Sequence, residues 1–401
     1  MPDHVNAPPR ESYARLFLRF LHFGLLAWGG PVAQIAMIRQ ELVEEERWVS
    51  RERFNRVLAV YQVLPGPEAH ELCVYFGMLA RGRIGAVLAG LGFMLPGFVL
   101  MFALSWFYVT FGVASLAFAA VFQGMQPAVG ALIVRAIHRI GQHALTDRWL
   151  WVIAATTGVS MLIGANFLVA LGVAGVAYLL VKRQSYVAAV AVSGVFLVGV
   201  SLAAWSVVSL DTASASISVD ASPVGPPSAL ALFGSGLRSG LLTFGGAYTV
   251  IPFLQYDAVR VGQWMTDAQF LDGLALSGIL PAPLIIFSTF VGYLGGGPVG
   301  ALALTIGIFL PAFGFTLIGH DVVERAVENR ALHAFLDGVT AGVVGLIAAT
   351  ALGLLRATLT SLPAWGIFAL ALLVLYRWKA RAAVAGIVLG AGVLGLLLFQ
   401  Q

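Results

Sequence analysis

The sequence predicts an all-α integral membrane protein with two inverted-topology repeats, each containing Pro/Gly-broken re-entrant helical hairpins. Three observations predict this fold: the composition, a set of motifs that occurs twice, and the placement of Lys and Arg. Of the 401 residues, 59% are hydrophobic and 10% are charged, whereas an average soluble domain has roughly 25% charged residues. The composition therefore favours a chain that lies in a lipid bilayer.

One long uncharged segment supports the membrane assignment. No Asp, Glu, Lys or Arg occurs from Ile84 to Val134, and about 20 apolar residues suffice to cross the hydrocarbon core, so this segment holds two spans. Residues 1–19 are polar and mixed in charge, which predicts a cytoplasmic tail rather than a cleavable signal peptide. The single cysteine, Cys73, excludes a disulfide framework and a thiolate metal cluster.

Hydrophobic stretches form two series along the chain. The first series lies at about 20–38, 57–79, 84–108, 113–134, 149–163, 166–181 and 186–208, and the second at about 229–254, 270–294, 298–319, 336–355, 364–376 and 382–399. The stretch at 186–208 has no counterpart in the second series. We therefore expect a tail at 1–19, a first repeat at 20–183, an extra helix with an external linker at 184–228, and a second repeat at 229–401.

The motifs of the first series recur in the second. The pairs are Trp28-Gly29-Gly30-Pro31 and Phe244-Gly245-Gly246-Ala247, Trp48 and Trp264, Pro65-Gly66-Pro67 and Pro281-Ala282-Pro283, and Pro96 and Pro311. The offset is 216 for the Trp pair and for Pro65 with Pro281, and 215 for Pro96 with Pro311. This register indicates an internal duplication, and duplicated broken helices in a membrane protein point to a transport site. We call residues 29–31, 65–67, 245–247 and 281–283 the first, second, third and fourth breaks.

The basic residues of the first series set its topology. They occupy positions 10, 15 and 19, then 39, 47, 51, 53 and 56, then 81 and 83, 135, 139 and 148, and 182 and 183. Because Lys and Arg favour the cytoplasmic side, the tail and the connections at 39–56 and 80–83 all belong to the cytoplasm. The stretches at 20–38 and 57–79 then enter and return as re-entrant hairpins, with half-helices of about ten residues that reach the midplane. Ordinary kinked spans remain the alternative.

The second series is expected to be inverted. The linker from Asp211 to Pro227 and the turn at Gly295–Gly297 contain no Lys or Arg and are expected outside, whereas positions 325, 330, 377, 379 and 381 are basic and are expected inside. Arg260 and Arg356 are mild exceptions. One extra span between two copies inverts the second copy. The N-terminus is therefore expected in the cytoplasm and the C-terminus in the periplasm.

Helices that begin near mid-membrane can bind an anion. Their unpaired N–H groups and positive dipole ends face the break, so no Lys or Arg has to be buried. Pro31, Pro67 and Pro283 stand where a helix can begin, and inversion brings hairpins from both leaflets together. The predicted binding residues are Gly29, Gly30, Pro31, Gln62, Pro65, Gly66, Pro67, Gly245, Gly246, Tyr248, Pro281, Ala282 and Pro283. Further polar side chains near the breaks are Gln34, Thr249, Ser277, Ser288 and Thr289, although such residues also bond to their own helix.

Ionisable residues follow the second break. Glu68, His70 and Glu71 are proton-coupling candidates because an ionisable residue within a span is by default functional. The equivalent positions of the second copy are Leu284, Ile286 and Phe287, which places the acids in the first copy alone. Alternatively, the hairpin is shallower and both acids lie in water at the cytoplasmic mouth. The segment 39–48 resembles a helix on the cytoplasmic face, with Trp48 at the headgroup level.

The remaining motifs argue against catalysis. The chain has no GxxxxGK[ST] loop, no His/Cys metal spacing and no Ser/His/Asp order that predicts an enzyme. We therefore expect neither a cofactor nor a metal site. The net charge of +4 does not indicate nucleic-acid binding, because the basic residues cluster at span ends.

Taken together, the motifs resemble one family. The Gly-Gly-Pro break, the charged link ending at Trp48, Leu64-Pro65-Gly66-Pro67, a later Leu-Pro-Gly-Phe, and FGGAYTVIPFLQ from Phe244 are similar to the long-chain, two-domain chromate transporter family (ChrA type) over roughly 20–135 and 233–347. The resemblance implies an inner-membrane exporter of chromate that confers chromate resistance, with sulfate as a competing analogue. Pro281-Ala282-Pro283 departs from the family's frequent Pro-Gly-Pro, and the acids after the second break replace the neutral polar residues of many members. An oxyanion channel and a sulfate-class transporter stay open as alternatives, as does a homodimer.

Overall fold

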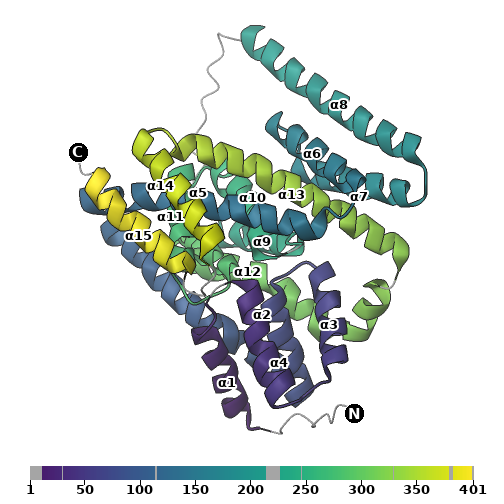
Figure 1. The fold of residues 1–401 in the computed structure, drawn as a ribbon, viewed down its shortest axis with the longest axis vertical. Helices are drawn as coiled ribbons and strands as arrows, with labels where there is room; N and C mark the ends of the chain where they lie inside the picture. The colour runs from purple at the N-terminus through teal and green to yellow at the C-terminus, as the bar shows by residue number, and fades with distance from the viewer. Residues whose placement is uncertain are drawn as a thin grey trace. The chain divides into compact units, whose positions relative to one another are not determined.

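The computed structural model describes residues 11–28, 30–112, 115–213, 226–244, 246–327, 329–378 and 383–399, and this part of the chain is helical with no strand (Figure 1). The predicted all-α class is confirmed. Of the topology markers, positions 10, 379 and 381 and most of the predicted linker lie outside the described residues.

Helices follow the predicted order in both copies. The first copy contains α1 (Tyr13–Leu25), α2 (Pro31–Arg39), η1 (Gln40–Glu45), α3 (Arg51–Val63), α4 (Glu68–Phe107), η2 (Tyr108–Gly112), α5 (Leu116–Ala144), α6 (Arg148–Leu162) and α7 (Phe167–Lys182). α8 (Tyr186–Ala213) follows. The second copy contains α9 (Ala229–Leu241), η3 (Ala247–Val250), α10 (Ile251–Gln255), η4 (Tyr256–Val261), α11 (Asp267–Gly278), η5 (Leu284–Ile286), α12 (Phe287–Val327), α13 (Arg330–Thr358), α14 (Leu362–Arg377) and α15 (Ala383–Leu398).

The duplication extends to local backbone geometry. α9, α11 and α15 each begin 216 residues after α1, α3 and α7. The π-helical turn η1 recurs as η4, and each is followed by a non-glycine residue with positive φ, 59° at Arg47 and 50° at Gln263. Such residues are uncommon, so their repetition shows that the turn is a property of the fold rather than of one sequence.

Within the described part of the chain, five helical segments are long and apolar enough to cross a membrane. They are Glu68–Gly112, Ala117–Ala144, Tyr186–Trp205, Leu284–Ile318 and Arg330–Thr358. α8 is apolar and largely uncovered, with Val187 86% and Trp205 76% exposed, as expected of a helix whose surroundings are hydrocarbon. α4 joins two predicted stretches across a kink at Arg81 and Gly82, where the backbone leaves helical geometry.

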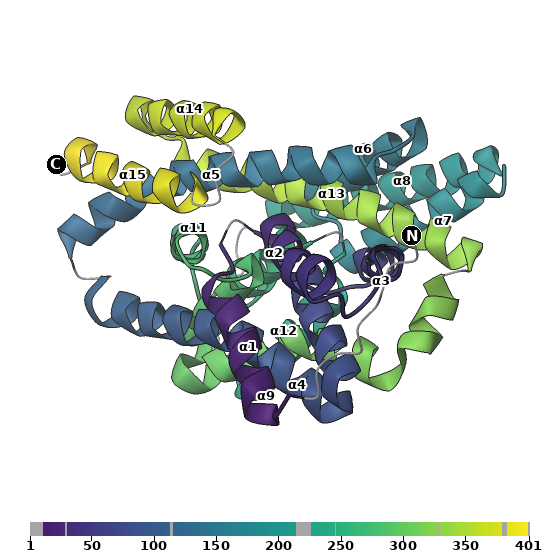
Figure 2. The ribbon, with the colours of Figure 1, turned by 60° about the horizontal axis from the view of Figure 1, so that its bottom comes forward.

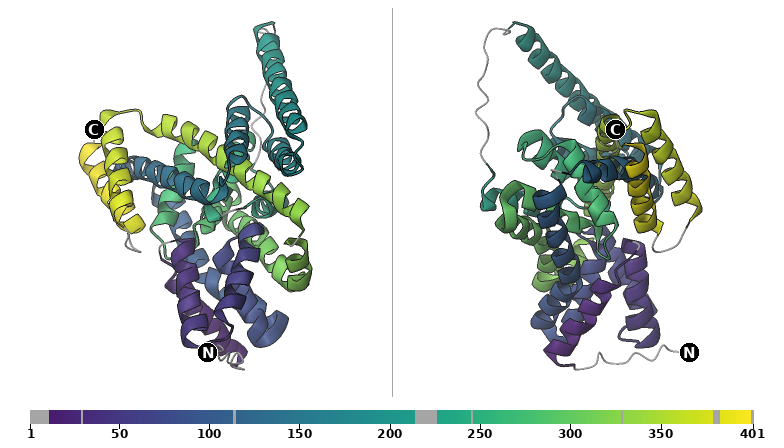
Figure 3. Two further views of the ribbon diagram at one scale, coloured as in Figure 1. Left: turned by 45° about the vertical axis from the view of Figure 1, so that its right-hand side comes forward. Right: turned by 90° about the vertical axis from the view of Figure 1, so that its left-hand side faces the viewer.

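The helices form two compact units that cut across the sequence repeats. The first unit comprises residues 1–135, 226–324 and 354–401, and the second comprises residues 136–225 and 325–353. In the second unit α7 packs between α6 and α8 (Figure 3), and Gly175 lies against the ring of Phe335. Tyr178, 2% exposed, belongs to its core.

In the first unit the two copies pack their opening helices alike. α1 lies along α4, where a Cβ on Gly92 would be 2.8 Å from the Phe17 carbonyl oxygen, and α9 lies along α12, where a Cβ on Gly307 would be 2.4 Å from the Phe233 carbonyl oxygen. Small residues allow such close contact between apolar helices. α14 and α15 lie side by side at the end of the chain (Figure 2). The contacts of α1 and α9 fix the helices that precede the first and third breaks.

Candidate functional site

All four breaks interrupt a helix. Gly30, with φ 78°, precedes α2, and Gly246, with φ 110°, precedes η3. Gly66, with φ 156°, lies in the buried loop between α3 and α4, and residues 281–283 separate α11 from η5. Gly29 and Gly245 lie outside the described residues.

Helix starts at the breaks differ from those elsewhere in each copy. The inner helices begin after Gly30, Pro67, Gly246 and Pro283, and no side-chain hydrogen bond caps any of these four starts. The outer helices α1, α3, α9 and α11 are capped by Ser12, Ser50, Ser228 and Thr266. A capping side chain satisfies one of the otherwise unpaired N–H groups of the first turn. The inner starts therefore leave donors available to water or to an anion.

Residues at or next to three breaks line one small cleft in the first unit, which we call the break cleft. Gly30 belongs to the first break, Ala282 to the fourth, and Tyr248 directly follows the third, and the cleft has a volume of ≈ 50 Å³. The other lining residues are Trp28, Ser277, Gly278, Leu280, Leu284, Val384 and Ala385. At 10–15 Å³ per water position, this volume holds about four water-sized groups, comparable to a five-atom tetrahedral oxyanion.

The second break is connected to the third by the backbone. The N–H of Gly66 donates to the carbonyl oxygen of Thr243 over 2.9 Å, just before the third break. The fourth break packs on α4, because a Cβ on Gly97 would lie only 2.6 Å from the Cβ of Ala282. In the described backbone, breaks of the two copies therefore lie close to one another.

The predicted polar residues have three different positions: in the break cleft, buried beside it in sequence, or exposed. Tyr248 and Ser277 line the break cleft, and the Ser277 hydroxyl donates to the Leu284 carbonyl over 3.1 Å. Gln34 is buried and donates to the Ala27 carbonyl over 2.9 Å, so its amide holds the approach to the first break. Gln62 is exposed on α3 and does not line the cleft.

The acids after the second break have different environments. Glu71 is 0% exposed, and a Cβ on Gly66 would lie 2.7 Å from its Oε1. Neither carboxylate oxygen of Glu71 has a hydrogen-bond partner among the described residues, whereas Glu68 is only half-buried. His70 is 0% exposed and its ring lies 4.8 Å from that of Phe313 and 4.9 Å from that of Phe309. The alternative in which both acids lie in water is therefore wrong for Glu71.

Sequence reasoning missed a buried acid in the second copy. Asp272 on α11 is 6% exposed and accepts hydrogen bonds from Tyr108 Oη over 2.8 Å and from Gln126 Nε2 over 2.9 Å. Buried acids therefore occur in both copies, although the comparison of the two motifs placed acids in the first copy alone. The available signal was an Asp inside the apolar stretch at 270–294, at a position where the first copy has Arg56.

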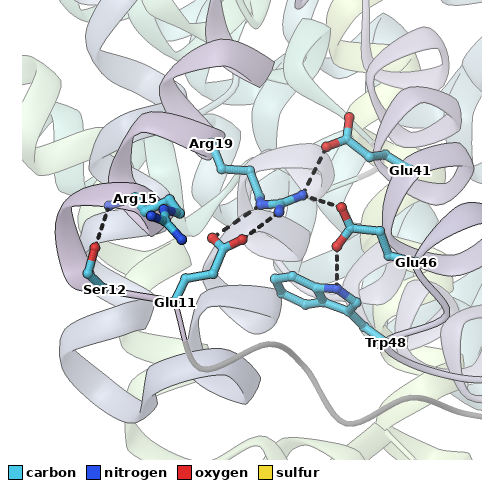
Figure 4. A network of polar contacts seen from close by, with 7 residues as sticks. All are labelled: Glu11, Ser12, Arg15, Arg19, Glu41, Glu46 and Trp48. Atoms are coloured by element: carbon cyan, nitrogen blue, oxygen red, sulfur yellow. Dashed lines mark hydrogen bonds and ion pairs between the residues drawn. The ribbon is translucent and has the colours of Figure 1, made fainter.

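A cluster of charges fastens α1 to the η1 segment (Figure 4). Arg19 contacts Glu11 over 2.6 Å, Glu41 over 3.1 Å and Glu46 over 2.5 Å, and the Trp48 indole N–H donates to Glu46 over 2.7 Å. Trp48 is only 2% exposed, so the expectation of a headgroup-level Trp48 is wrong. Its ring packs on Phe76 of α4, a long-range contact that local charge patterning does not reveal.

The equivalent cluster of the second copy is smaller. The Ser235 hydroxyl donates to the Asp257 carboxylate over 2.5 Å, and Arg238 forms an ion pair with the same carboxylate. Ser235 and Asp257 stand 216 residues after Arg19 and Glu41. Both copies therefore connect the opening helix to the π-helical turn at the same positions, with different chemistry.

The repeated unit, the apolar helices and the broken helix starts define a helical membrane protein. A family model described as "Chromate transporter" matches residues 14–198 and 230–396, one segment in each copy. The chain belongs to the chromate transporter family, and both matched segments together cover most of its length.

Known relatives agree with this assignment. The chain is 57% identical over 398 residues to a "Chromate transport protein" of Pseudomonas aeruginosa, covering 98% of this chain and 94% of that protein. It is 29% identical to a "Chromate transport protein" of Cupriavidus metallidurans, covering 98% and 95% of the two chains. It is also 29% identical to a "Probable chromate transport protein" of Synechococcus elongatus, covering 99% and 98%. No solved structure matches the fold.

Proposed function

We propose that this protein is a secondary transporter of the bacterial inner membrane that exports chromate from the cytoplasm and so confers chromate resistance. The oxyanion binds in the break cleft, at the uncapped starts of helices from both copies. The observation that carries the proposal is that Gly30 of the first break, Ala282 of the fourth and Tyr248, the residue after the third, line one cleft. Family membership supplies chromate as the transported ion.

The chemistry of the cleft suits an anion. First-turn N–H groups and the positive ends of helix dipoles stabilise negative charge, and the Tyr248 side chain adds a hydroxyl donor. Among the described residues the cleft is lined by no Lys or Arg, so in this proposal the helix starts and the Tyr248 hydroxyl bind the anion without a permanent cation. Sulfate has the same tetrahedral shape and is the expected competitor.

Inverted topology supports alternating access in this proposal. The unmatched helix α8 stands between the two copies in the chain. By crossing the membrane once more it inverts the topology of the second copy, with the N-terminus in the cytoplasm and the C-terminus in the periplasm. The hairpins formed by α1 with α2 and by α3 with the start of α4 are re-entrant from the cytoplasm, and those of the second copy are re-entrant from the periplasm. Rocking of one copy against the other exposes the cleft to each side in turn.

The membrane potential favours export. A dianion that leaves an inside-negative cell gains about 2.3 kcal/mol per charge at 100 mV, or about 4.6 kcal/mol in total. At about 1.4 kcal/mol per decade, this energy supports a gradient above a thousandfold. Proton coupling is not required thermodynamically, and Glu68, His70 and Glu71 are the candidates for it in the first copy. Of these, Glu68 directly follows the second break in the chain, and the Glu71 carboxylate lies against Gly66.

Uptake into inverted membrane vesicles tests the proposal. Radiolabelled chromate and sulfate are supplied with and without a pH gradient, and the proposal predicts saturable chromate uptake that sulfate inhibits. Gly194→Val on α8, where a Cβ meets no atom within 4 Å, serves as a matched control for substitutions at the breaks. Large, weakly saturating currents would favour the oxyanion-channel alternative, and saturable sulfate uptake without chromate uptake would favour a sulfate-class transporter.

A further inference from the structure

Asp272 lies at a junction between the two copies within the first unit. It projects from α11 of the second copy, while its two hydrogen-bond donors belong to the first copy, Tyr108 on η2 and Gln126 on α5. The corresponding hairpin arm of the first copy is joined to the second copy by neutral groups, since the hydroxyls of Tyr61 on α3 and Thr316 on α12 are 3.0 Å apart. We call these two contacts between a hairpin arm and the other copy tethers, and only the tether at Asp272 contains a carboxylic acid.

The Asp272 carboxylate has no cation beside it. Among the described residues it forms no ion pair, and both of its partners are neutral. α11 also packs on α15 and η5, which have no ionisable residue, on α12, where Tyr293 is the one ionisable residue among the described side chains, and on α4. The ionisable residues of α4 are Glu68, His70, Glu71, Cys73, Tyr75, Arg81 and Arg83, none of them in the part after the kink that leads to Tyr108, and those of α5 begin at Arg135. An unpaired buried charge is costly, which favours proton uptake.

The partners of Asp272 suit both protonation states. Gln126 donates its amide N–H₂ to the carboxylate, and a rotated amide presents its carbonyl oxygen to a protonated carboxyl group. Tyr108 donates to the second oxygen in either state. The tether can therefore gain or lose a proton while the hydrogen bonds between α11 and the first copy are kept.

Asp272 is close enough to the break cleft to sense an anion. The same helix ends in Ser277 and Gly278, which line the cleft, and Ser277 is five residues beyond Asp272, or about 8 Å at 1.5 Å per residue. At this separation and an effective dielectric constant of about 20, a unit charge on Asp272 weakens anion binding in the cleft about thirtyfold for each unit of charge on the anion. A charged Asp272 opposes an anion in the cleft, and a neutral one does not.

We propose that Asp272 is a proton-binding site linked to the break cleft, which takes up a proton when a tetrahedral oxyanion binds and releases it when the oxyanion leaves. The inference rests on the proposed function and adds to it a coupling residue in the second copy. Linkage is reciprocal, so acidic conditions tighten anion binding and anion binding draws protons from solution.

Equilibrium binding of radiolabelled sulfate to the full-length protein in lipid nanodiscs tests this site. Sulfate is the probe because its own charge does not change between about pH 5 and about pH 8, where an ordinary Asp is already ionised. We expect the Kd for sulfate to rise at least tenfold across this range, and proton uptake to accompany sulfate addition in weakly buffered solution. Binding without pH dependence in the wild type overturns the inference while leaving the proposed function intact.

Two substitutions assign the effect to a residue. Asp272→Asn is nearly isosteric and keeps a hydrogen bond to each partner, and it is expected to reduce the change in Kd to below threefold and to abolish proton uptake. Asp147→Asn, which neutralises a carboxylate of the second unit that does not line the break cleft, is the matched control and is expected to keep a change of at least tenfold. An Asp272→Asn variant that retains a threefold or larger change overturns the inference.

A second variant covers the case in which Asp272→Asn does not fold. Tyr108→Phe leaves the carboxyl group but removes a donor that favours its charged form. The pH at which sulfate binding is half lost is expected to move upward, with unchanged affinity at about pH 5. An unmoved midpoint contradicts the assignment. A wild-type protein that binds neither sulfate nor chromate contradicts the proposed function and this inference together.

Discussion

Gly66→Ala is the substitution whose effect the structure defines most fully. Gly66 has φ 156° and donates its N–H to Thr243, and the added Cβ would lie 2.7 Å from Oε1 and 3.0 Å from Cδ of Glu71. An unfavourable backbone conformation costs about 1–3 kcal/mol, and overpacking of a filled site costs about 1–3 kcal/mol. The variant is thus expected to lose about 2–6 kcal/mol of stability, a large part of the 5–15 kcal/mol typical of a folded protein.

The second expected effect of Gly66→Ala is on transport. Displacement of Glu71 or of the second break disturbs the neighbouring third break through the bond to Thr243. We expect at least a tenfold loss of chromate uptake, because misplacement by about 1 Å can cost a hundredfold at a working site. Uptake in vesicles and thermal unfolding of the purified protein measure the two effects.

A control and a second substitution separate the causes. Gly82 also has positive φ, 62°, but a Cβ there meets no atom within 4 Å, so Gly82→Ala reports backbone strain alone. Adding Glu71→Ala to Gly66→Ala removes the steric conflict, and the double variant is expected to be more stable than the sum of the single effects predicts. The reasoning is refuted if Gly66→Ala unfolds no earlier than Gly82→Ala and transports chromate normally.

Three further predictions concern other parts of the molecule. Tyr248→Phe removes the hydroxyl of a residue that lines the break cleft. Because a hydrogen bond to a charged group contributes about 1.5–3 kcal/mol, the KM for chromate uptake should rise about tenfold or more with normal expression. An unchanged KM would exclude the hydroxyl from binding. Arg19→Met leaves the carboxylates of Glu11, Glu41 and Glu46 without their shared partner. Since all of these groups are partly exposed, we expect the free energy of unfolding, measured by heat or denaturant, to fall by about 1–3 kcal/mol, less than for a fully buried pair. Arg15→Met, on the exposed side of the same helix, is the control and should change it little. In the second unit, burial acts to raise the pKa of Asp147, but the Tyr178 hydroxyl and the N–H groups of Leu150 and Trp149 outweigh it and hold the pKa below its ordinary value; stability from Asp147 is therefore present above the ordinary carboxyl pKa and lost as the pH falls through the lower folded-state value. Asp147→Asn should weaken this acid-dependent loss while the start of α6 stays capped, because Asn and Asp are equally good N-cap residues, and an identical acid-unfolding curve would contradict the assignment.

Much of the fold could be read from the sequence because it depends on local signals. Proline and glycine mark each interruption, and between the interruptions the predicted hydrophobic stretches lie mainly in helix over the residues that the structure describes. The Ser and Thr caps of the outer helices are also local, and they recur at the same offset as the breaks. Duplication made these signals stronger, since a break that appears twice in the same register is not accidental.

The parts that sequence reasoning missed depend on distant contacts. Trp48 looked like an interfacial residue because its neighbours are charged, but Phe76 and Arg19 enclose it. No sequence pattern singled out Asp272, and its hydrogen bonds become visible only when Tyr108 and Gln126 of the other copy are placed beside it. Gln62 is near the second break in sequence, but its helix face is exposed. Which side of a helix faces a partner is decided by packing, and the Pro/Gly pattern does not specify it.

The central claim is that the breaks of both copies form one oxyanion site, and the anomalous X-ray signal of chromium in crystals grown with chromate tests it most directly. The account predicts a single strong peak in the break cleft, beside Gly30, Tyr248 and Ala282, which is lost in Tyr248→Trp because the larger side chain fills the space. An empty break cleft together with a strong, saturable chromium peak elsewhere in the membrane-spanning helices would contradict it.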